Sequence, residues 1–329
     1  MASGNITQRD NITKIAIIRR NGLGDFIAGT VPLCNYLKDK YNNKLKFYFF
    51  ISSRNMGIVK YFFPDSESVL IPDGNKYFTH FVTALKHKSL SPDIGVIPVP
   101  EYSKLSSIFM KLLGAKDIYG NVEDSLLAKC FINHPCTIYN DKPYEKFHVS
   151  LRTLNLIDSS FYDTPRKYYP QFRQDQISGF MLNDISQRPY IMVEISNNRD
   201  YCQLSIEKTA RIINRFHETF EFTTLITGKP QDSDKATKLK SLLDSKSEFH
   251  LTNTLDEFIA YVNKSTYVLA GDGGLGHIAG ALGKKLVCLY GVTSVERWGV
   301  LGENVIHLYD PSDVNNIPDN EILNALRKI

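Results

Sequence analysis

The sequence predicts an α/β protein in which two parallel sheets, each covered by helices, face each other across a cleft. Three observations predict this fold class. The chain has 329 residues, which is long for one ordinary domain and sufficient for two. Short apolar runs alternate with segments of helical length, as in parallel sheets that are buried on both faces. The alternation stops near residues 158–187 and then starts again, which indicates a second sheet.

The first half of the chain contains four predicted strands, with amphipathic helices between them. Two of these helices are expected over residues 25–39 and 102–113. The strands are the apolar runs "KIAIIRR" (14–20), "LKFYFFIS" (45–52), "SVLIPD" (68–73) and "IGVIPVP" (94–100).

The segment over residues 158–187 is predicted to connect two domains. It is rich in polar residues and turn formers, and it contains Pro165 and Pro170. We therefore place an N-terminal domain at residues 1–165, a linker at 166–187 and a C-terminal domain at 188–329.

The second half repeats the alternation and ends in a short amphipathic helix over residues 319–329. Other helices are expected over 205–219, 232–244 and 254–263, and one begins at about residue 276. The strands are "RPYIMVEIS" (188–196), "FTTLITG" (222–228), "EFHLT" (248–252), "YVLAGD" (267–272) and "KLVCLYG" (285–291). In open sheets of this kind, ligands lie beyond the carboxyl ends of the strands. The loops after 14–20, 188–196 and 267–272 are therefore the candidate site.

The composition predicts a cytoplasmic globular protein. The hydrophobic fraction of 43% is sufficient for two cores. The N-terminus lacks the apolar stretch of a secretory signal, and no apolar run is long enough to span a membrane. Five scattered cysteines suit a reducing compartment. The net charge of +4 is spread along the chain, which argues against nucleic acid as a partner. It suits an anionic small molecule or an acidic membrane surface.

One short stretch contains three side chains that could bind a metal ion. The stretch "CFINHPC" contains Cys130, His134 and Cys136. Their spacing is irregular and no second pair of ligands follows, so we expect a loop here and not a metal centre.

The most informative segment is "AGDGGLGHIAGALGKKLVCLYG" at residues 270–291. "GDGGLG" matches a dinucleotide-binding pattern, but the next strand ends without the acidic residue that this pattern requires. Close packing of a helix on the sheet accounts for Gly280 and Gly283. A third interpretation is a bound anion, because the first N–H groups of a helix are unpaired and its dipole favours negative charge. Asp272 would then contact sugar hydroxyls or cap the helix. This interpretation predicts a nucleotide-sugar or a similar phosphate ester.

The stretch "GDGGLGHIAGALGKKLVCLYGVTSVERWGV" resembles the signature of glycosyltransferase family 9, the bacterial lipopolysaccharide heptosyltransferases. That signature is D-T-G-L-S-H-x-A-A-A-L-G-K-P, then a strand, then G-x-T-x-x-x-R-W-G-P. The matching residues include the only tryptophan of the chain, Trp298. "KIAIIRRNGLGDFIAGTVPL", "GAKDIYG", "HVSLRTLNLI" and "ITGKPQDSD" are similar to other parts of the family. The resemblance covers most of the chain and implies two facing Rossmann-like domains, the GT-B arrangement, with a deep cleft between them.

The resemblance also implies an activity and a set of site residues. The activity is an inverting transfer of heptose, or a related sugar, that needs no metal ion and no cofactor. Asp25 occupies the position of the catalytic base, although an aspartate after a turn is also a common helix cap. Acceptor contacts are expected from Gly24 and, because basic side chains of the first domain could meet acidic sugars or phosphates, from Arg54, Lys104 and Lys111. Donor contacts are expected from Ser196, Arg199, Lys229, Asp232, Asp234, Asp272, Gly273, Gly274, Leu275, Gly276 and His277.

One departure from the family pattern lies after residue 196. The family presents S/T-x-x-x-x-K-x-W-P, in which the lysine neutralises the diphosphate, whereas this chain has Cys202 at the lysine position and Leu204 at the tryptophan position. Arg199 and Lys229 are the candidates for the missing charge. A rearranged donor pocket, a donor other than ADP-heptose, and weak activity all remain compatible with this change.

Three functional hypotheses follow. The first is a heptosyltransferase that uses a nucleotide-sugar donor and a lipid-linked or protein-linked saccharide acceptor, with peripheral contact to the inner membrane. The second is a nucleotide-sugar-binding protein on the same scaffold that has little or no turnover, which the absent lysine favours. The third, a nicotinamide-dependent oxidoreductase, is disfavoured by the missing ribose carboxylate.

Overall fold

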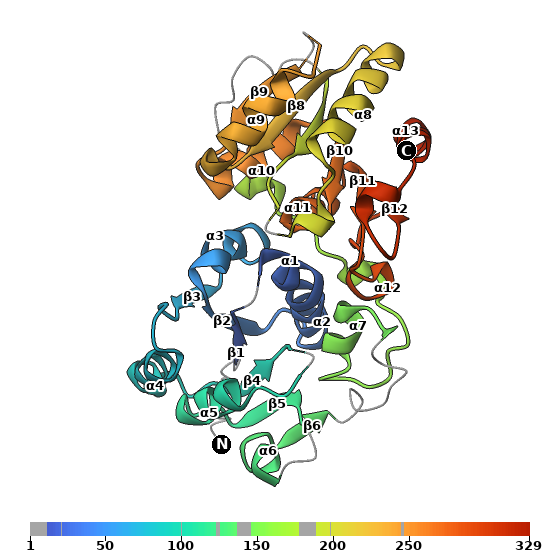
Figure 1. Ribbon diagram of the computed structural model, residues 1–329. Coiled ribbons are helices and arrows are strands. Elements are labelled where there is room, and N and C mark those ends of the chain that lie inside the picture. The colour runs from blue at the N-terminus through green and yellow to red at the C-terminus, as the bar shows by residue number, and fades with distance from the viewer. Residues whose placement is uncertain are drawn as a thin grey trace, which may run out of the picture.

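Two six-stranded parallel sheets form the framework of the protein (Figure 1). The computed structural model describes residues 12–20, 22–99, 101–122, 126–136, 146–177, 189–197, 199–244 and 247–329. The strand order is β3-β2-β1-β4-β5-β6 in the first sheet and β12-β11-β10-β7-β8-β9 in the second. Counted from its own first strand, each sheet has the order 3-2-1-4-5-6, which is that of a Rossmann fold. The predicted α/β class with two Rossmann-like domains is confirmed.

The first sheet is built on the apolar runs that the sequence predicts. Ile17 lies in its centre, is fully buried and pairs with Phe49 on one side and Val96 on the other. Two further strands, β5 and β6, were not predicted; β6 has three residues and pairs only with β5. The strands are β1 (Thr13–Arg19), β2 (Leu45–Ile51), β3 (Glu67–Leu70), β4 (Ile94–Ile97), β5 (Asp117–Asn121) and β6 (His134–Cys136).

The second sheet repeats this arrangement. Leu269 in its centre pairs with Val193 and Val287, and all three side chains are buried. The edge strand β12 was not predicted. The strands are β7 (Tyr190–Glu194), β8 (Thr223–Gly228), β9 (Ser247–Leu251), β10 (Tyr267–Gly271), β11 (Lys285–Tyr290) and β12 (Val305–Tyr309).

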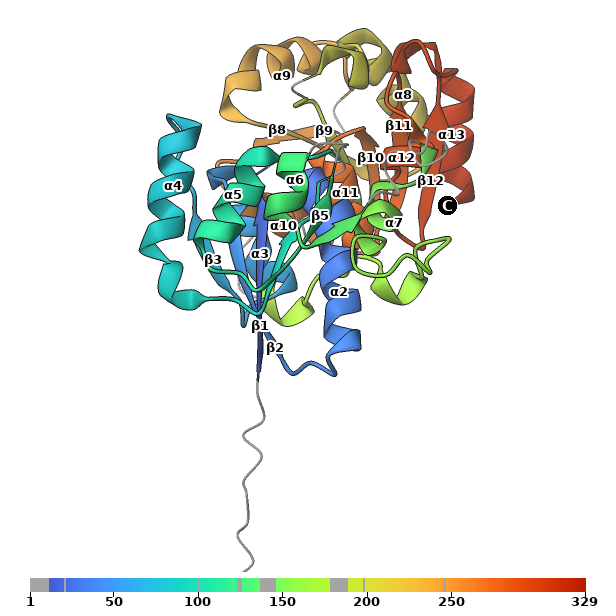
Figure 2. The ribbon, with the colours of Figure 1, turned by 90° about the horizontal axis from the view of Figure 1, so that it is seen from below.

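Helices cover the faces of both sheets (Figure 2). The helix predicted over 25–39 consists of α1 (Leu23–Asp25), a π-helical turn over Phe26–Thr30 and α2 (Val31–Lys40). Among the described residues, no helix is both long and apolar enough to cross a membrane. The other helices are α3 (Ser53–Phe62), α4 (Lys76–Lys86), α5 (Lys104–Leu112), α6 (Leu126–Phe131), α7 (Val149–Leu154), α8 (Ile206–Thr219), α9 (Ser233–Lys240), α10 (Leu255–Lys264), α11 (Gly274–Ala281), α12 (Val295–Trp298) and α13 (Asp319–Lys328).

The described part of the predicted linker, residues 166–177, packs into the joint between the two halves. Phe172 is buried and stacks on Phe62 of α3, with ring centroids 4.6 Å apart. Its N–H donates to the carbonyl of Ala281 in α11 at 3.0 Å. Residues 178–187 lie outside the described residues. The segment from 166 to 177 is therefore anchored to both halves and is not a free connection.

The buried apolar core is continuous across the joint. One cluster contains Phe26 from the first half together with Leu275 and Ile278 from α11. Because each strand order reverses beside the first strand, the carboxyl ends of β1, β7 and β10 lie where ligands bind in such sheets. The fold therefore brings the three candidate loops to one place.

Candidate active site

A cavity of about 1000 Å³ lies between the two halves, at the carboxyl ends of the central strands. The first half contributes the turn after β1 and Arg54 at the start of α3. The second half contributes the loops after β7, β8, β9 and β10 and the start of α11. Of the residues predicted from the sequence, the cavity is lined by Gly24, Asp25, Arg54, Ser196, Arg199, Lys229, Asp272, Gly273, Gly274, Leu275 and His277.

The start of α11 is open toward this cavity. Gly273 is the N-cap residue, with φ of −180°, so its extended backbone does not itself require glycine. A side chain at Gly273 or Gly274 would have room, because the nearest atoms to an added Cβ are 3.6 Å and 3.9 Å away. Since the first N–H groups of a helix have no partner within it, bare backbone faces the cavity here.

The neighbouring glycines serve packing instead. A Cβ on Gly271 would lie 2.2 Å from the carbonyl oxygen of Cys202, and one on Gly280 would lie 2.3 Å from Val300. Gly276, which was expected among the donor contacts, does not line the cavity; it faces Cys288 and Val300. The glycine-rich segment therefore combines two functions, close packing at 271, 276 and 280 and an open helix start at 273 and 274.

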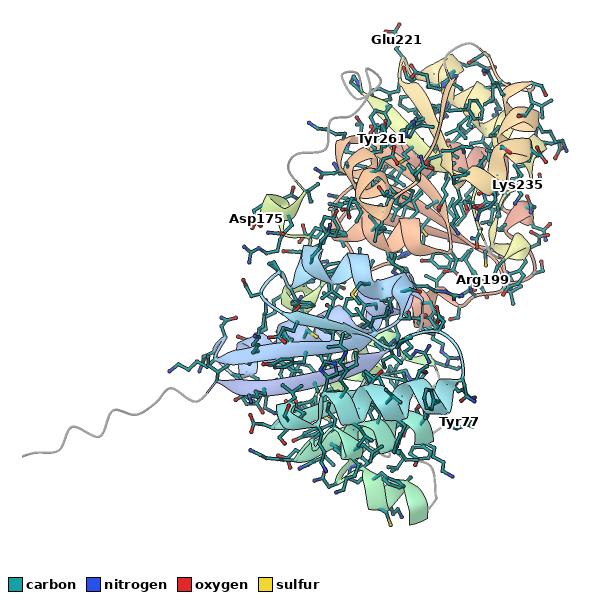
Figure 3. All side chains as sticks on the ribbon, turned by 90° about the vertical axis from the view of Figure 1, so that its left-hand side faces the viewer. Tyr77, Asp175, Arg199, Glu221, Lys235 and Tyr261 are labelled. Atoms are coloured by element: carbon teal, nitrogen blue, oxygen red, sulfur yellow. The ribbon has the colours of Figure 1, made fainter. Side chains whose placement is uncertain are left out.

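Arg199 and Asp272 form an ion pair at the wall of the cavity. The guanidinium Nη2 lies 2.9 Å from Asp272 Oδ2, and it also donates to the Asp272 carbonyl at 3.2 Å. The Asn197 side chain donates to the same carbonyl at 3.1 Å. Asp272 is buried, whereas the Arg199 side chain is 42% exposed. The carboxylate thus fixes a partly exposed arginine at the wall of the cavity. Figure 3 labels Arg199 at the edge of the upper half.

Cys202, at the position where the family has lysine, cannot supply a positive charge. Its side chain is fully buried and its Sγ lies 3.7 Å from Asp272 Oδ2. Burial raises the pKa of this thiol. Arg199 lowers this pKa, and Asp272 raises it further. Among the residues that the structure describes, Arg199 and Lys229 are the positively charged side chains that line the cavity from the second half.

His277 joins the two halves of the site. It is buried at the start of α11, and a Cβ on Gly24 would lie 2.7 Å from its Cδ2 atom. Burial lowers the pKa of His277 to about 4, although Asp272 opposes this effect. The imidazole is therefore neutral near pH 7. Only a glycine at position 24 allows the turn after β1 to approach it so closely.

Asp25 faces the cavity from the first half. Its Oδ1 lies 3.2 Å from Nη2 of Arg19, which is fully buried, while the Asp25 side chain is 26% exposed. Arg19 is itself held by the carbonyl of Pro98. Gly22, not Asp25, is the N-cap residue of α1, and Asp25 makes no side-chain cap hydrogen bond to the turn that follows. The buried arginine therefore orients a partly exposed carboxylate.

Glu194 lines the cavity and was missed in the sequence. It is the last residue of β7, close to the charges of Lys229 and Asp232. Burial raises the pKa of Glu194 to about 8; Lys229 opposes the rise and Asp232 adds to it. A carboxylic acid that ends an apolar strand is the signal that identifies such a residue. The remaining lining residues that were not predicted as ligands include Asn197, Gln231, Asn253, Thr254, Phe258, Thr293 and Trp298.

Besides Gly276, four predicted site residues do not line the cavity. Asp232 is buried and accepts a hydrogen bond from the N–H of Lys229 at 3.0 Å, so it shapes the loop after β8. Asp234 is exposed on α9. Lys104 and Lys111 are exposed on α5. His134 and Cys136 do not form a cluster with Cys130: His134 contacts Asp117, Cys136 is buried and Cys130 is exposed.

Two facing Rossmann-like sheets with a site between them define the GT-B class of glycosyltransferases. The model of glycosyltransferase family 9 (heptosyltransferase) matches residues 97–329. The chain therefore belongs to this family and is a glycosyltransferase by family. No curated protein sequence matches it.

Solved structures share the fold at low sequence identity. A family 9 glycosyltransferase from Veillonella parvula has a TM-score of 0.79 and 15% identity, covering 97% of both chains. The ADP-heptose lps heptosyltransferase II of E. coli has a TM-score of 0.75 and 15% identity, covering 96% of this chain and 98% of its own. E. coli heptosyltransferase WaaC, solved with ADP, has a TM-score of 0.75 and 15% identity, covering 96% and 99%. At this identity the likeness establishes the fold.

The environment of Glu194 predicts a pH dependence of stability. The folded protein keeps a proton on Glu194 up to about pH 8, whereas an ordinary glutamate releases it above pH 4.5. The free energy of unfolding therefore falls between about pH 4.5 and about pH 8, by at most about 1.4 kcal/mol per pH unit, and the contribution of Glu194 is lost above that range. The Glu194→Gln variant should lose this fall.

Urea unfolding measured between about pH 6.5 and pH 8 tests this expectation, because the buried histidines lower the stability only below their ordinary pKa. Glu248→Gln, a change of an exposed glutamate in β9, is the matched control. An identical decline in the wild type and in Glu194→Gln would contradict the assignment.

Proposed function

We propose that this protein transfers heptose, or a related sugar, from a nucleotide-sugar such as ADP-heptose to a lipopolysaccharide-core or related saccharide acceptor. One observation carries the proposal: a carboxylate of the first half and the open start of α11 in the second half line the same cavity. E. coli WaaC structures with ADP and with ADP-2-deoxy-2-fluoro heptose support the donor class by analogy.

The diphosphate of the donor would bind at the start of α11. The free N–H groups and the helix dipole favour an anion, and the missing side chains at Gly273 and Gly274 allow close approach. Arg199 and Lys229 would supply the positive charge that Cys202 cannot. Glu194, protonated near neutral pH, is a hydrogen-bond donor for the nucleoside end, beside Gln231 in the loop after β8.

The reaction would be a single displacement with inversion. An acceptor hydroxyl forms a bond to the anomeric carbon, and the bond from that carbon to the diphosphate oxygen breaks. The proton of the hydroxyl passes to Asp25, and the electron pair of the broken bond leaves with the diphosphate. Gly24 and Arg54, which line the cavity from the first half, would contact the acceptor. The acceptor is a saccharide linked to lipid or protein, reached from the cytoplasmic side of the inner membrane.

Asp25→Asn tests the base. The variant keeps the shape of the side chain and its position beside Arg19, so donor affinity measured by calorimetry should stay near the wild-type value. Turnover should fall by about 100-fold or more, because the proton acceptor is lost. Asp65→Asn, which changes an exposed carboxylate outside the cavity, should leave both quantities unchanged. Full activity of Asp25→Asn would refute the base assignment.

Gly273→Ala tests the diphosphate position. The methyl group has room in the free protein but would occupy the space proposed for the diphosphate. The melting temperature should therefore be unchanged, while donor affinity falls by about tenfold or more. Gly271→Ala is the contrasting variant, because its Cβ would meet a backbone oxygen at 2.2 Å and should destabilise the fold. Unaltered donor binding by Gly273→Ala would place the diphosphate elsewhere.

Removal of divalent ions tests the proposed independence from metals. Asp272, the carboxylate beside the helix start, is already paired with Arg199, and cationic side chains would neutralise the diphosphate. Turnover should therefore persist in excess EDTA. Loss of activity in EDTA that Mg²⁺ restores would show that the leaving group needs a metal ion.

A nucleotide-sugar-binding protein without turnover is the second candidate. Cys202 favours it, because this buried thiol stands where the family has a cation. Calorimetry with ADP-heptose beside an assay of ADP release separates the two candidates: both predict binding, and only the first predicts product.

A further inference from the structure

Helix α4 exposes its large apolar side chains and buries its small and polar ones. Tyr77 and Phe78 are 65% and 67% exposed, and Phe81, Val82 and Leu85 are also exposed. These positions recur at a spacing of three to four residues, so they form one continuous face. The side of α4 that packs against the protein contains His80, Thr83 and Ala84. This arrangement is the reverse of an ordinary surface helix.

An apolar groove continues this face toward α5. The groove has a volume of about 400 Å³ and lies between Tyr77, Phe78 and Phe81 of α4 and Leu105, Ile108 and Leu112 of α5. Its position is well defined, because the Asn75 side chain caps α4 by accepting from the N–H groups of Tyr77 and Phe78. We call the exposed face of α4 with this groove the α4–α5 surface.

Lysines surround the α4–α5 surface without acidic neighbours in the two helices. Neither α4 nor α5 contains Asp or Glu, and residues 74–92 contain none. Five exposed lysines lie in or beside the two helices, and none of them has an ion-pair partner within 4 Å among the described residues. They are Lys76, Lys86, Lys88, Lys104 and Lys111.

The surface lies on the same side of the molecule as one wall of the cavity. Figure 3 shows Tyr77, at the start of α4, and Arg199, at the wall of the cavity, on the same side. The turn before α4 is tied to the cavity loops, because Asp73 pairs with Arg20 at 3.5 Å and accepts from Ser53 at 3.4 Å. Gly22 and Arg54, which follow these residues, line the cavity.

We propose that the α4–α5 surface docks the protein onto an anionic lipid bilayer, with the apolar face of α4 inserted between the headgroups. Aromatic and aliphatic side chains on one face with lysines around them are the pattern of an interfacial helix. The lysines match the charge of anionic headgroups and repel a second copy of the same surface. The side of the molecule that carries Arg199 at the cavity wall would then face the membrane, where a lipid-linked acceptor is reached. The docking itself does not depend on the donor or on turnover.

Vesicle flotation tests the docking with the full-length protein. Vesicles of phosphatidylglycerol mixed with phosphatidylcholine should bind the protein, and pure phosphatidylcholine should bind it about tenfold less. The F78S/F81S variant should lose binding by about tenfold or more, because two inserting rings are removed. The K86E/K88E variant should lose binding to the anionic vesicles.

Matched variants keep this test specific. Tyr162→Ser changes an 89% exposed aromatic residue in the segment that follows α7 and should bind like the wild type. Helix α7 lies on the other side of the first sheet from α4 (Figure 1). K240E/K328E makes the same charge change on exposed lysines of the second half and should also have no effect. Unchanged melting temperatures establish that the variants fold.

Two outcomes would overturn the docking proposal. The first is an absence of binding to anionic vesicles, or equal binding to neutral ones. The second is that the wild type sediments as a dimer, that F78S/F81S sediments as a monomer, and that neither binds vesicles. This result would make the α4–α5 surface a contact between two copies of the chain. Neither outcome bears on sugar transfer to a soluble acceptor.

Discussion

The contact between Gly24 and His277 is the constraint on which the site depends. It joins the turn after the first strand of one sheet to the first turn of α11 in the other, and apolar packing through Phe26 and Leu275 continues below it. A side chain at position 24 would separate the two halves, and burial disfavours a charged imidazole more strongly than Asp272 favours it. The contact therefore requires both a glycine at position 24 and a neutral imidazole at His277, whose pKa is lowered by burial.

Electrostatic balance around the start of α11 explains how the chain tolerates Cys202. An unpaired Asp272 carboxylate would repel a phosphate, but here the guanidinium of Arg199 neutralises its charge. The guanidinium is only partly buried, so it holds the carboxylate and still faces the cavity. The buried thiol fills the space beneath this pair without adding a charge. A cation therefore lines the cavity from a different position in the same loop.

The sequence predicted the central strands and the place of the site better than the edges and the outer contacts. Central strands such as 14–20 are continuous apolar runs because both faces are buried. By contrast β6 and β12 are edge strands with one partner, and His134 and His307 interrupt their apolar pattern. The sequence also could not distinguish Gly273, whose Cβ position is open, from Gly276, whose Cβ position is occupied. That difference depends on Cys288 and Val300, which are brought close to Gly276 only by the tertiary packing.

Helix α4 shows where the relation between sequence pattern and burial breaks down. In a helix that only covers a sheet, Phe78 and Phe81 would face inward and Thr83 outward, and the free energy of the isolated protein would be lower. The chain instead caps this helix firmly at Asn75 and keeps its aromatic face in solvent. Local violations of folding rules are expected where function opposes stability. The exposed face therefore needs an apolar environment outside the protein, and the lysines beside it restrict that environment to one with negative charge.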